Sequence, residues 1–140
     1  MQRGRRIAFD YGDVRIGVAV SDPDSILASP LTTLKTADKN VLKEISTIFL
    51  DIDPVAIFVG RPALLSGQDG IASTKANLFV DQLKSITNVP IELIDERMST
   101  ISAARNLRDA GRNAKNSKDA IDMASAVAIL EFALEMEKRK

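Results

Sequence analysis

The sequence predicts an α/β fold with a mixed five-stranded sheet, three antiparallel strands followed by two parallel strands, and helices on both faces. Two runs rich in β-forming residues, 6–10 and 16–21, are separated by five residues, which favours an antiparallel hairpin. Farther along the chain, a stretch with helical spacing leads into a continuous apolar run, and this happens twice. That order is typical of a strand, a crossover helix and a parallel strand.

The remaining elements follow from the same periodicities and from the residues that interrupt them. Further strands are expected at 27–34, 55–60 and 91–94, and Pro54 and Pro90 stand just before the last two. Helices are expected at 38–52, 71–86, 99–111 and from Lys118 nearly to the C-terminus. Ser99 is suited to cap the third of these helices and Gly111 to end it.

Composition restricts the chemistry that this chain can perform. Its 140 residues suit one domain, expected to span 1–140, and they include no cysteine and no histidine. A disulfide framework, an ordinary zinc site, a thiol nucleophile and an imidazole base are therefore excluded. No stretch approaches the ~20 apolar residues of a membrane helix, and the start lacks the apolar region of a secretory signal. We expect a cytoplasmic protein without a membrane partner.

Carboxylates gather where the parallel strands are expected to end. Right-handed crossovers place the carboxyl ends of the first, fourth and fifth strands at one sheet edge, which collects Asp10, Gly60 and the pair Asp95 and Glu96. In the last helix, Asp119 and Asp122 are three residues apart and share one face. If the first turn of that helix packs against the same edge, three or four carboxylates converge there.

Each acid also has an ordinary structural role. Asp10 could accept hydrogen bonds from turn amides, the fifth-strand pair could bind Arg97, and the last-helix acids could interact with the helix dipole. Together, however, clustered acids repel one another unless cations relieve them. Mg²⁺ or Mn²⁺ suits an all-oxygen site, and two such ions ~4 Å apart support hydrolysis of a phosphodiester without an imidazole.

Positive charge is local rather than general, because 19 basic residues balance 19 acidic ones. One segment has five basic residues against Asp109 alone, for a net charge of +4: Arg105, Arg108, Arg112, Lys115 and Lys118. It is either a solvated surface or a contact for a nucleic-acid backbone. The terminal groups Arg3, Arg5, Arg6 and 138–140 are expected to be solubilising or to make supplementary backbone contacts.

Five blocks in order, DYGDVRIGVAVSD with ASPLTTL, then VGRPALLSGQDG, IDERMST and DAIDMASAVAILE, resemble the YqgF (RuvX) family of RNase H-like proteins. The resemblance covers almost the whole chain. It implies an RNase H-like fold and a hydrolase that acts as a divalent-metal-dependent endonuclease. It also implies that Asp10, the acid of DER and Asp122 are the catalytic metal ligands, with Asp119 as an auxiliary ligand. Within DER, Glu96 is favoured over Asp95 because strand alternation points the two to opposite faces.

The same resemblance suggests substrate contacts around the carboxylates. Backbone approach near the substrate is expected at Gly12, Gly60, Gly67 and Gly70, and cationic contacts at Arg15, Arg61 and Arg97 beside the basic segment. The turn reads GDVRIG where many family members have a lysine before the arginine, and the loop reads GRPALLSGQDG where GLPLNMDG is commoner. Tyr11 is a candidate for stacking on a base, or for packing within the protein.

The family is described as nucleases that mature the 5′ end of pre-16S ribosomal RNA and as Holliday-junction resolvases similar to RuvC. The resemblance favours structured RNA, with ribosome biogenesis as the process, over branched DNA. We expect a monomer or weak homodimer. Two other classes stay open. The DYG turn also resembles the first phosphate loop of actin-like ATPases, and a ribosome-assembly factor could use the basic segment to hold RNA without cleaving it.

Overall fold

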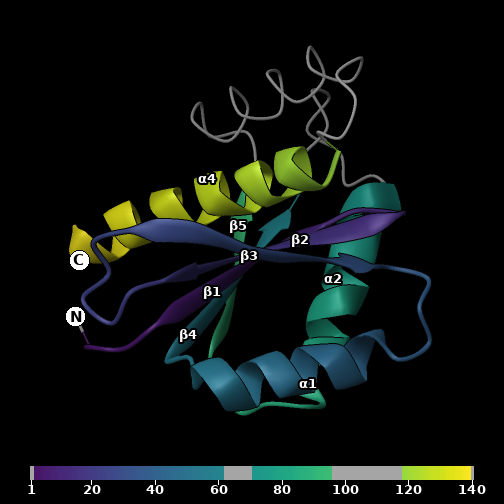
Figure 1. Ribbon diagram of the computed structural model, residues 1–140, viewed down its shortest axis with the longest axis horizontal. Helices are drawn as coiled ribbons and strands as arrows, with labels where there is room; N and C mark the ends of the chain where they lie inside the picture. The colour runs from purple at the N-terminus through teal and green to yellow at the C-terminus, as the bar shows by residue number, and fades with distance from the viewer. Residues whose placement is uncertain (1, 62–70, 96–117, 140) are drawn as a thin grey trace.

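The computed structural model describes residues 2–61, 71–95 and 118–139, and it contains one five-stranded sheet with the order β3-β2-β1-β4-β5 (Figure 1). β1 pairs antiparallel with β2 and parallel with β4, while β2 pairs antiparallel with β3 and β4 parallel with β5. The strands are Arg6–Tyr11 (β1), Arg15–Ser21 (β2), Ala28–Lys35 (β3), Ala56–Arg61 (β4) and Ile91–Asp95 (β5). The predicted mixed sheet is therefore confirmed.

Three described helices connect or cover these strands. They are Val41–Ile52 (α1), Ile71–Lys84 (α2) and Lys118–Lys138 (α4). The helix expected at 99–111 lies outside the described residues. Asp53 caps the C-terminal end of α1: it takes a left-handed conformation (φ 53°) and donates its N–H to the Phe49 carbonyl, and Pro54 then blocks further helix. Among the described helices, none is long and apolar enough to cross a membrane.

Side chains of β1 alternate between two apolar layers, as its alternating pleat requires. Ile7 and Phe9 belong to the layer beneath α1 and α2, where the Phe9 ring meets Phe49 and Phe79 edge to face at centroid distances of 6.1 and 5.5 Å. Ala8 belongs to the other layer, which α4 covers. Helices therefore pack on both faces, as predicted, and each residue of β1 has an assigned face.

The layer beneath α4 pairs small residues with large ones. Ala8 and Ala19 of the sheet and Ala126 and Ala133 of the helix are buried, so α4 approaches the sheet closely. Larger side chains fill the space between them: Phe58, Ile94, Ile129, Leu130 and Leu134. In the described part of α4, the buried residues from Ala126 to Leu134 form the apolar stripe that packs on the sheet.

Candidate functional site

The carboxyl ends of β1, β4 and β5 meet at one edge of the sheet, as the sequence predicts. Phe9 is in register with Val59, and Val59 with Leu93, so the strands are aligned across the sheet. Counting one residue forward, Asp10, Gly60 and Ile94 occupy one row at this edge. Arg61 and Asp95 are partners in the next row. Ligands of open α/β sheets bind just outside such an edge.

Asp10 is a buried carboxylate at this edge, with 4% of its surface exposed. It follows Phe9 by one residue and Ala8 by two, so alternation assigns it to the face that α4 covers. Burying a carboxylate costs free energy unless hydrogen bonds, cations or metal ions compensate its charge. Asp10 has an interaction partner within the protein. Its burial in the layer of Ala8, Phe58 and Ile94, at the edge where ligands of open α/β sheets bind, makes it a candidate functional residue.

Asp95 lies at the same edge but has the opposite facing. Ile91 and Leu93 pack against the layer beneath α1 and α2, whereas Ile94 belongs to the layer beneath α4. Asp95 is two residues beyond Leu93, so strand alternation places both on the same face, away from the layer of Asp10. The register thus separates these two acids across the sheet. Glu96, the other acid of the pair, lies outside the described residues.

The direction of α4 is fixed by its contact with the first residue of β1. The guanidinium Nε of Arg6 donates to Glu137 Oε2 at 2.9 Å, and Glu137 is in the last turn of α4. The C-terminal end of the helix thus lies at the start of β1, near the N-terminus of the chain (Figure 1). Its N-terminal end must then extend toward the carboxyl end of β1, where Asp10 lies.

The backbone positions of Asp119 and Asp122 are part of this N-terminal end. Position 122 precedes Ala126 by four residues and Ile129 by seven, which places it on the same stripe of the helix as these buried residues. Position 119 lies one turn earlier on that stripe. The side chains of both acids lie outside the described part of the structure. Among the residues that it does describe, no group of three acids that could hold a metal ion is formed.

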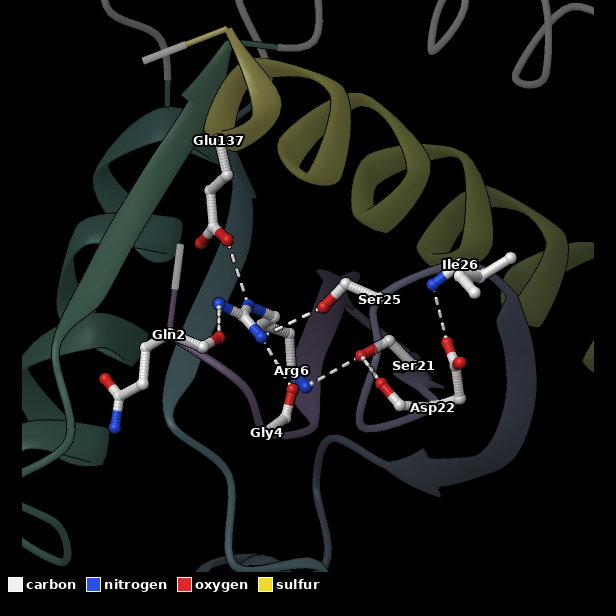
Figure 2. Close-up of polar contacts among 8 residues, drawn as sticks. All are labelled: Gln2, Gly4, Arg6, Ser21, Asp22, Ser25, Ile26 and Glu137. Carbon is white, nitrogen blue, oxygen red and sulfur yellow. Dashed lines mark hydrogen bonds and ion pairs between the residues drawn. The ribbon is translucent and has the colours of Figure 1, made fainter.

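Arg6 makes a buried network that the sequence analysis did not predict (Figure 2). Its side chain donates to the carbonyls of Gly4 and Gln2 at 2.6 Å each, and to Ser25 Oγ at 2.9 Å, in addition to Glu137. The expectation that Arg6 is a solubilising surface cation is wrong, since only 2% of it is exposed. Arg6 is two residues before Ala8, so strand alternation places both side chains in the layer beneath α4. This alternation was the sequence signal that could have predicted the burial of Arg6.

The turn between β1 and β2 is held from two sides. Its Gly12 carbonyl accepts a hydrogen bond from Thr36 Oγ1 at 2.7 Å, and Lys75 of α2 forms a 2.7 Å ion pair with Asp13. The hydrogen bond to Asp13 and the negative charge of that carboxylate raise the pKa of Lys75. A Cβ on Gly12 would lie 2.7 Å from the Arg15 carbonyl oxygen, so this tight turn requires glycine.

Of the predicted cationic contacts with substrate, only Arg15 has a described side chain. Arg15 is half-buried at the start of β2, two residues beyond Asp13. Arg61 closes β4 and Lys118 opens α4, and their side chains are not described. Eight predicted site residues lie wholly outside the described ranges: Glu96, Arg97, Arg105, Arg108, Arg112, Lys115, Gly67 and Gly70.

The mixed sheet, with α4 on one face and α1 and α2 on the other, is an RNase H-like fold. The structure is similar to T. thermophilus RuvC in complex with a Holliday junction substrate, with a TM-score of 0.65 and 14% identity over 96% of both chains. It is also similar to Fowlpox virus resolvase in complex with its Holliday junction DNA, with a TM-score of 0.52 and 11% identity over 94% of this chain and 99% of that one.

Sequence comparison assigns the family. Residues 4–136 match the model of the RuvX family, described as Holliday junction resolvase. A Streptomyces coelicolor relative named "Putative pre-16S rRNA nuclease" is 43% identical over 99% of this chain and 84% of its own length. A Cutibacterium acnes relative of the same name is 44% identical over 94% of this chain and 82% of its own. The chain belongs to the RuvX (YqgF) family.

Proposed function

We propose that this protein is a divalent-metal-dependent nuclease that hydrolyses phosphodiester bonds in structured RNA, most specifically in 5′-end maturation of pre-16S ribosomal RNA. The observation that carries the proposal is Asp10, a 4% exposed carboxylate at the carboxyl edge of β1, on the face toward which the N-terminal end of α4 extends. The names of the relatives support the reaction and the substrate. One nuclease domain over 1–140 and a cytoplasmic location remain predictions.

The residues at this edge fit an oxygen-ligated divalent ion. Asp10 has the facing and the burial of a ligand, and position 122 is on the stripe of α4 that packs against the same layer. The parity of β5 excludes Asp95 from that face and favours Glu96, two positions beyond Ile94. In such a site Mg²⁺ or Mn²⁺ supplies Lewis-acid activation of water and of the leaving oxygen.

The protein's own groups then have separate tasks. Asp10, Glu96 and Asp122 would supply the negative charge that attracts the ions, with Asp119 as an auxiliary group. Arg15 and the basic residues of 105–118 hold the nucleic-acid backbone beside the edge. The braced Gly12 turn keeps the chain following Asp10 in place, because Lys75 and Thr36 tie it to α2 and to the end of β3.

A cleavage assay with two matched carboxylate variants tests the proposal. Wild type, Asp10→Asn and Asp95→Asn are incubated with Mg²⁺ or Mn²⁺ on a 5′-extended pre-16S RNA and on a four-way DNA junction. We expect metal-dependent RNA cleavage by wild type, a loss of roughly a hundredfold or more in Asp10→Asn, and near wild-type rates in Asp95→Asn. Unchanged cleavage in Asp10→Asn contradicts the proposal. Cleavage of the junction alone makes the protein a resolvase.

The same proteins separate the two other classes. RNA binding of equal strength in wild type and Asp10→Asn, without cleavage by either, identifies a non-catalytic assembly factor. ATP turnover, or a nucleotide-dependent rise in melting temperature, identifies an actin-like ATPase domain.

A further inference from the structure

A cavity of about 270 Å³ lies on the other side of the sheet edge from Asp10. Aromatic and aliphatic side chains of the layer beneath α1 and α2 form its floor, among them Tyr11 and Phe79. Its polar lining includes Asp38 and Lys39 from the segment before α1, and Gln82 from α2. Pockets for drug-sized ligands measure roughly 300–1,000 Å³, so this cavity suits a smaller molecule, such as one planar ring system.

The aromatic part of the lining suits a flat ligand. The rings of Tyr11 and Phe79 are 4.8 Å apart at their centroids and tilted by 33° to each other, so two aromatic rings in contact line the cavity. Phe79 is buried, whereas Tyr11 is only half-buried at the end of β1. Tyr11 thus packs within the protein and still presents part of its ring to the cavity. Exposed aromatic rings bind nucleobases by stacking.

The polar part of the lining has hydrogen-bonding capacity to spare. Within the described residues, the side chains of Lys39 and Gln82 have no hydrogen bond or ion pair. One carboxylate oxygen of Asp38 accepts from the Asn40 N–H at 2.9 Å, and the other is open to a donor. An amide that both donates and accepts matches the edge of a base, and the carboxylate matches an exocyclic amino group.

The cavity is also next to the candidate cleavage site in the chain. Tyr11 follows Asp10 directly, about 3.8 Å away at Cα, and the two side chains lie on opposite faces of the sheet at its carboxyl edge. A strand that continued around this edge from a phosphate held at Asp10 would reach the cavity. We propose that this cavity binds one unpaired nucleobase of that strand, on Tyr11 and against Gln82. This inference rests on the proposed function for the identity of the strand.

The test uses the fact that Tyr11 is the only tyrosine of the chain. Protein with ¹³C-labelled tyrosine gives one set of ring signals, which report on the cavity directly. It is titrated in EDTA, which prevents metal-dependent cleavage, with a single-stranded RNA of about ten nucleotides, an abasic strand of equal length, and 5′-AMP. We expect the RNA to shift the Tyr11 signals and the abasic strand not to do so.

Two tryptophan variants test the position of the base. Gln82→Trp, at an exposed position of α2, should fill the cavity and weaken RNA binding by roughly 5- to 150-fold, the contribution of one stacked base. Asn77→Trp adds the same side chain at an exposed position of α2 outside the lining, and it should bind within about twofold of wild type. Circular dichroism verifies that both variants are folded.

Several outcomes would overturn the inference. They are an equal Tyr11 shift with the abasic strand, no shift with RNA or 5′-AMP at saturating concentration, and unchanged RNA affinity in Gln82→Trp. Tighter binding of 5′-AMP than of RNA would replace the strand with a free nucleotide as the source of the base. Cleavage by wild type without a Tyr11 response overturns only this inference, whereas a base-dependent response without cleavage overturns only the nuclease.

Discussion

Replacing Arg6 by methionine should strongly destabilise the fold, because Arg6 is a buried cation that forms an ion pair and several hydrogen bonds. Only 3% of the Arg6 side-chain surface is exposed. Its guanidinium donates hydrogen bonds to Glu137, Ser25, Gly4 and Gln2. Methionine replaces the aliphatic stem of arginine with an uncharged chain but not the guanidinium, so it leaves these acceptors without their donor. Breaking a buried ion pair by removing one partner costs about 3–5 kcal/mol.

Glu137 sets the expected loss near the lower end of that range. Its side chain is 18% exposed, so its carboxylate recovers part of its hydration when Arg6 is removed. We therefore expect a loss of about 3 kcal/mol in the free energy of unfolding. With a urea m-value of about 2 kcal/mol per molar, the unfolding midpoint falls by about 1.5 M. Urea titration followed by circular dichroism at 222 nm in the far ultraviolet measures this shift.

Arg3 provides the matched control, because it forms an ion pair of the same length in solvent. Its Nε is 2.9 Å from Asp24, but the two side chains are 73% and 56% exposed. Arg3→Met should cost at most about 1 kcal/mol. A loss in Arg6→Met no larger than in Arg3→Met would refute the reasoning. It would mean that the network shown in Figure 2 does not hold the end of α4 against β1.

Three further predictions concern single groups. The Asp13 carboxylate raises the pKa of Lys75 above its ordinary 10.5. The stability that this ion pair gives the fold is therefore complete below pH 10.5 and is lost as the pH rises through the folded-state pKa of Lys75. Asp13→Asn should lower the pKa of Lys75 toward 10.5 in an NMR titration. The hydrogen bond from the Leu27 amide lowers the pKa of Asp22 below 3.8. The stability that this hydrogen bond gives the fold is therefore present above pH 3.8 and is lost as the pH falls through the folded-state pKa of Asp22. An NMR titration of the Asp22 carboxyl chemical shift measures this pKa. Ser125 has a buried Oγ without a hydrogen bond in the described structure. Ser125→Ala should therefore leave the free energy of unfolding unchanged or raise it by up to about 1 kcal/mol.

The cavity and the candidate cleavage site have one structural cause. Consecutive residues of a strand face opposite sides of the sheet, so the carboxyl end of β1 presents Asp10 to the layer beneath α4 and Tyr11 to the layer beneath α1 and α2. One short segment thereby serves two surfaces. A strand of nucleic acid that bound along this edge, as proposed, would meet both.

Local patterns in the sequence were sufficient to predict the mixed sheet and the position of the edge that carries the candidate site. The hairpin spacing, the apolar run of β4 and the right-handed crossover rule already place Asp10, Gly60 and Asp95 at one edge, and the structure confirms that placement. These features depend on neighbours that are near in sequence or on general topology. Strand ends and helical spacing also indicated the acids expected to complete the site, and the resemblance across five separate blocks implied their roles as metal ligands.

Only the tertiary structure decided the faces and the long-range contacts. The pairing of Val59 with Leu93 fixes the register that separates Asp95 from Asp10, and the Arg6–Glu137 pair, 131 positions apart, fixes the direction of α4. The cavity beside Tyr11 likewise needs α2 and the segment before α1 to come together. Such features depend on which surfaces meet after folding, and neither residue type nor periodicity records a partner so distant in the chain.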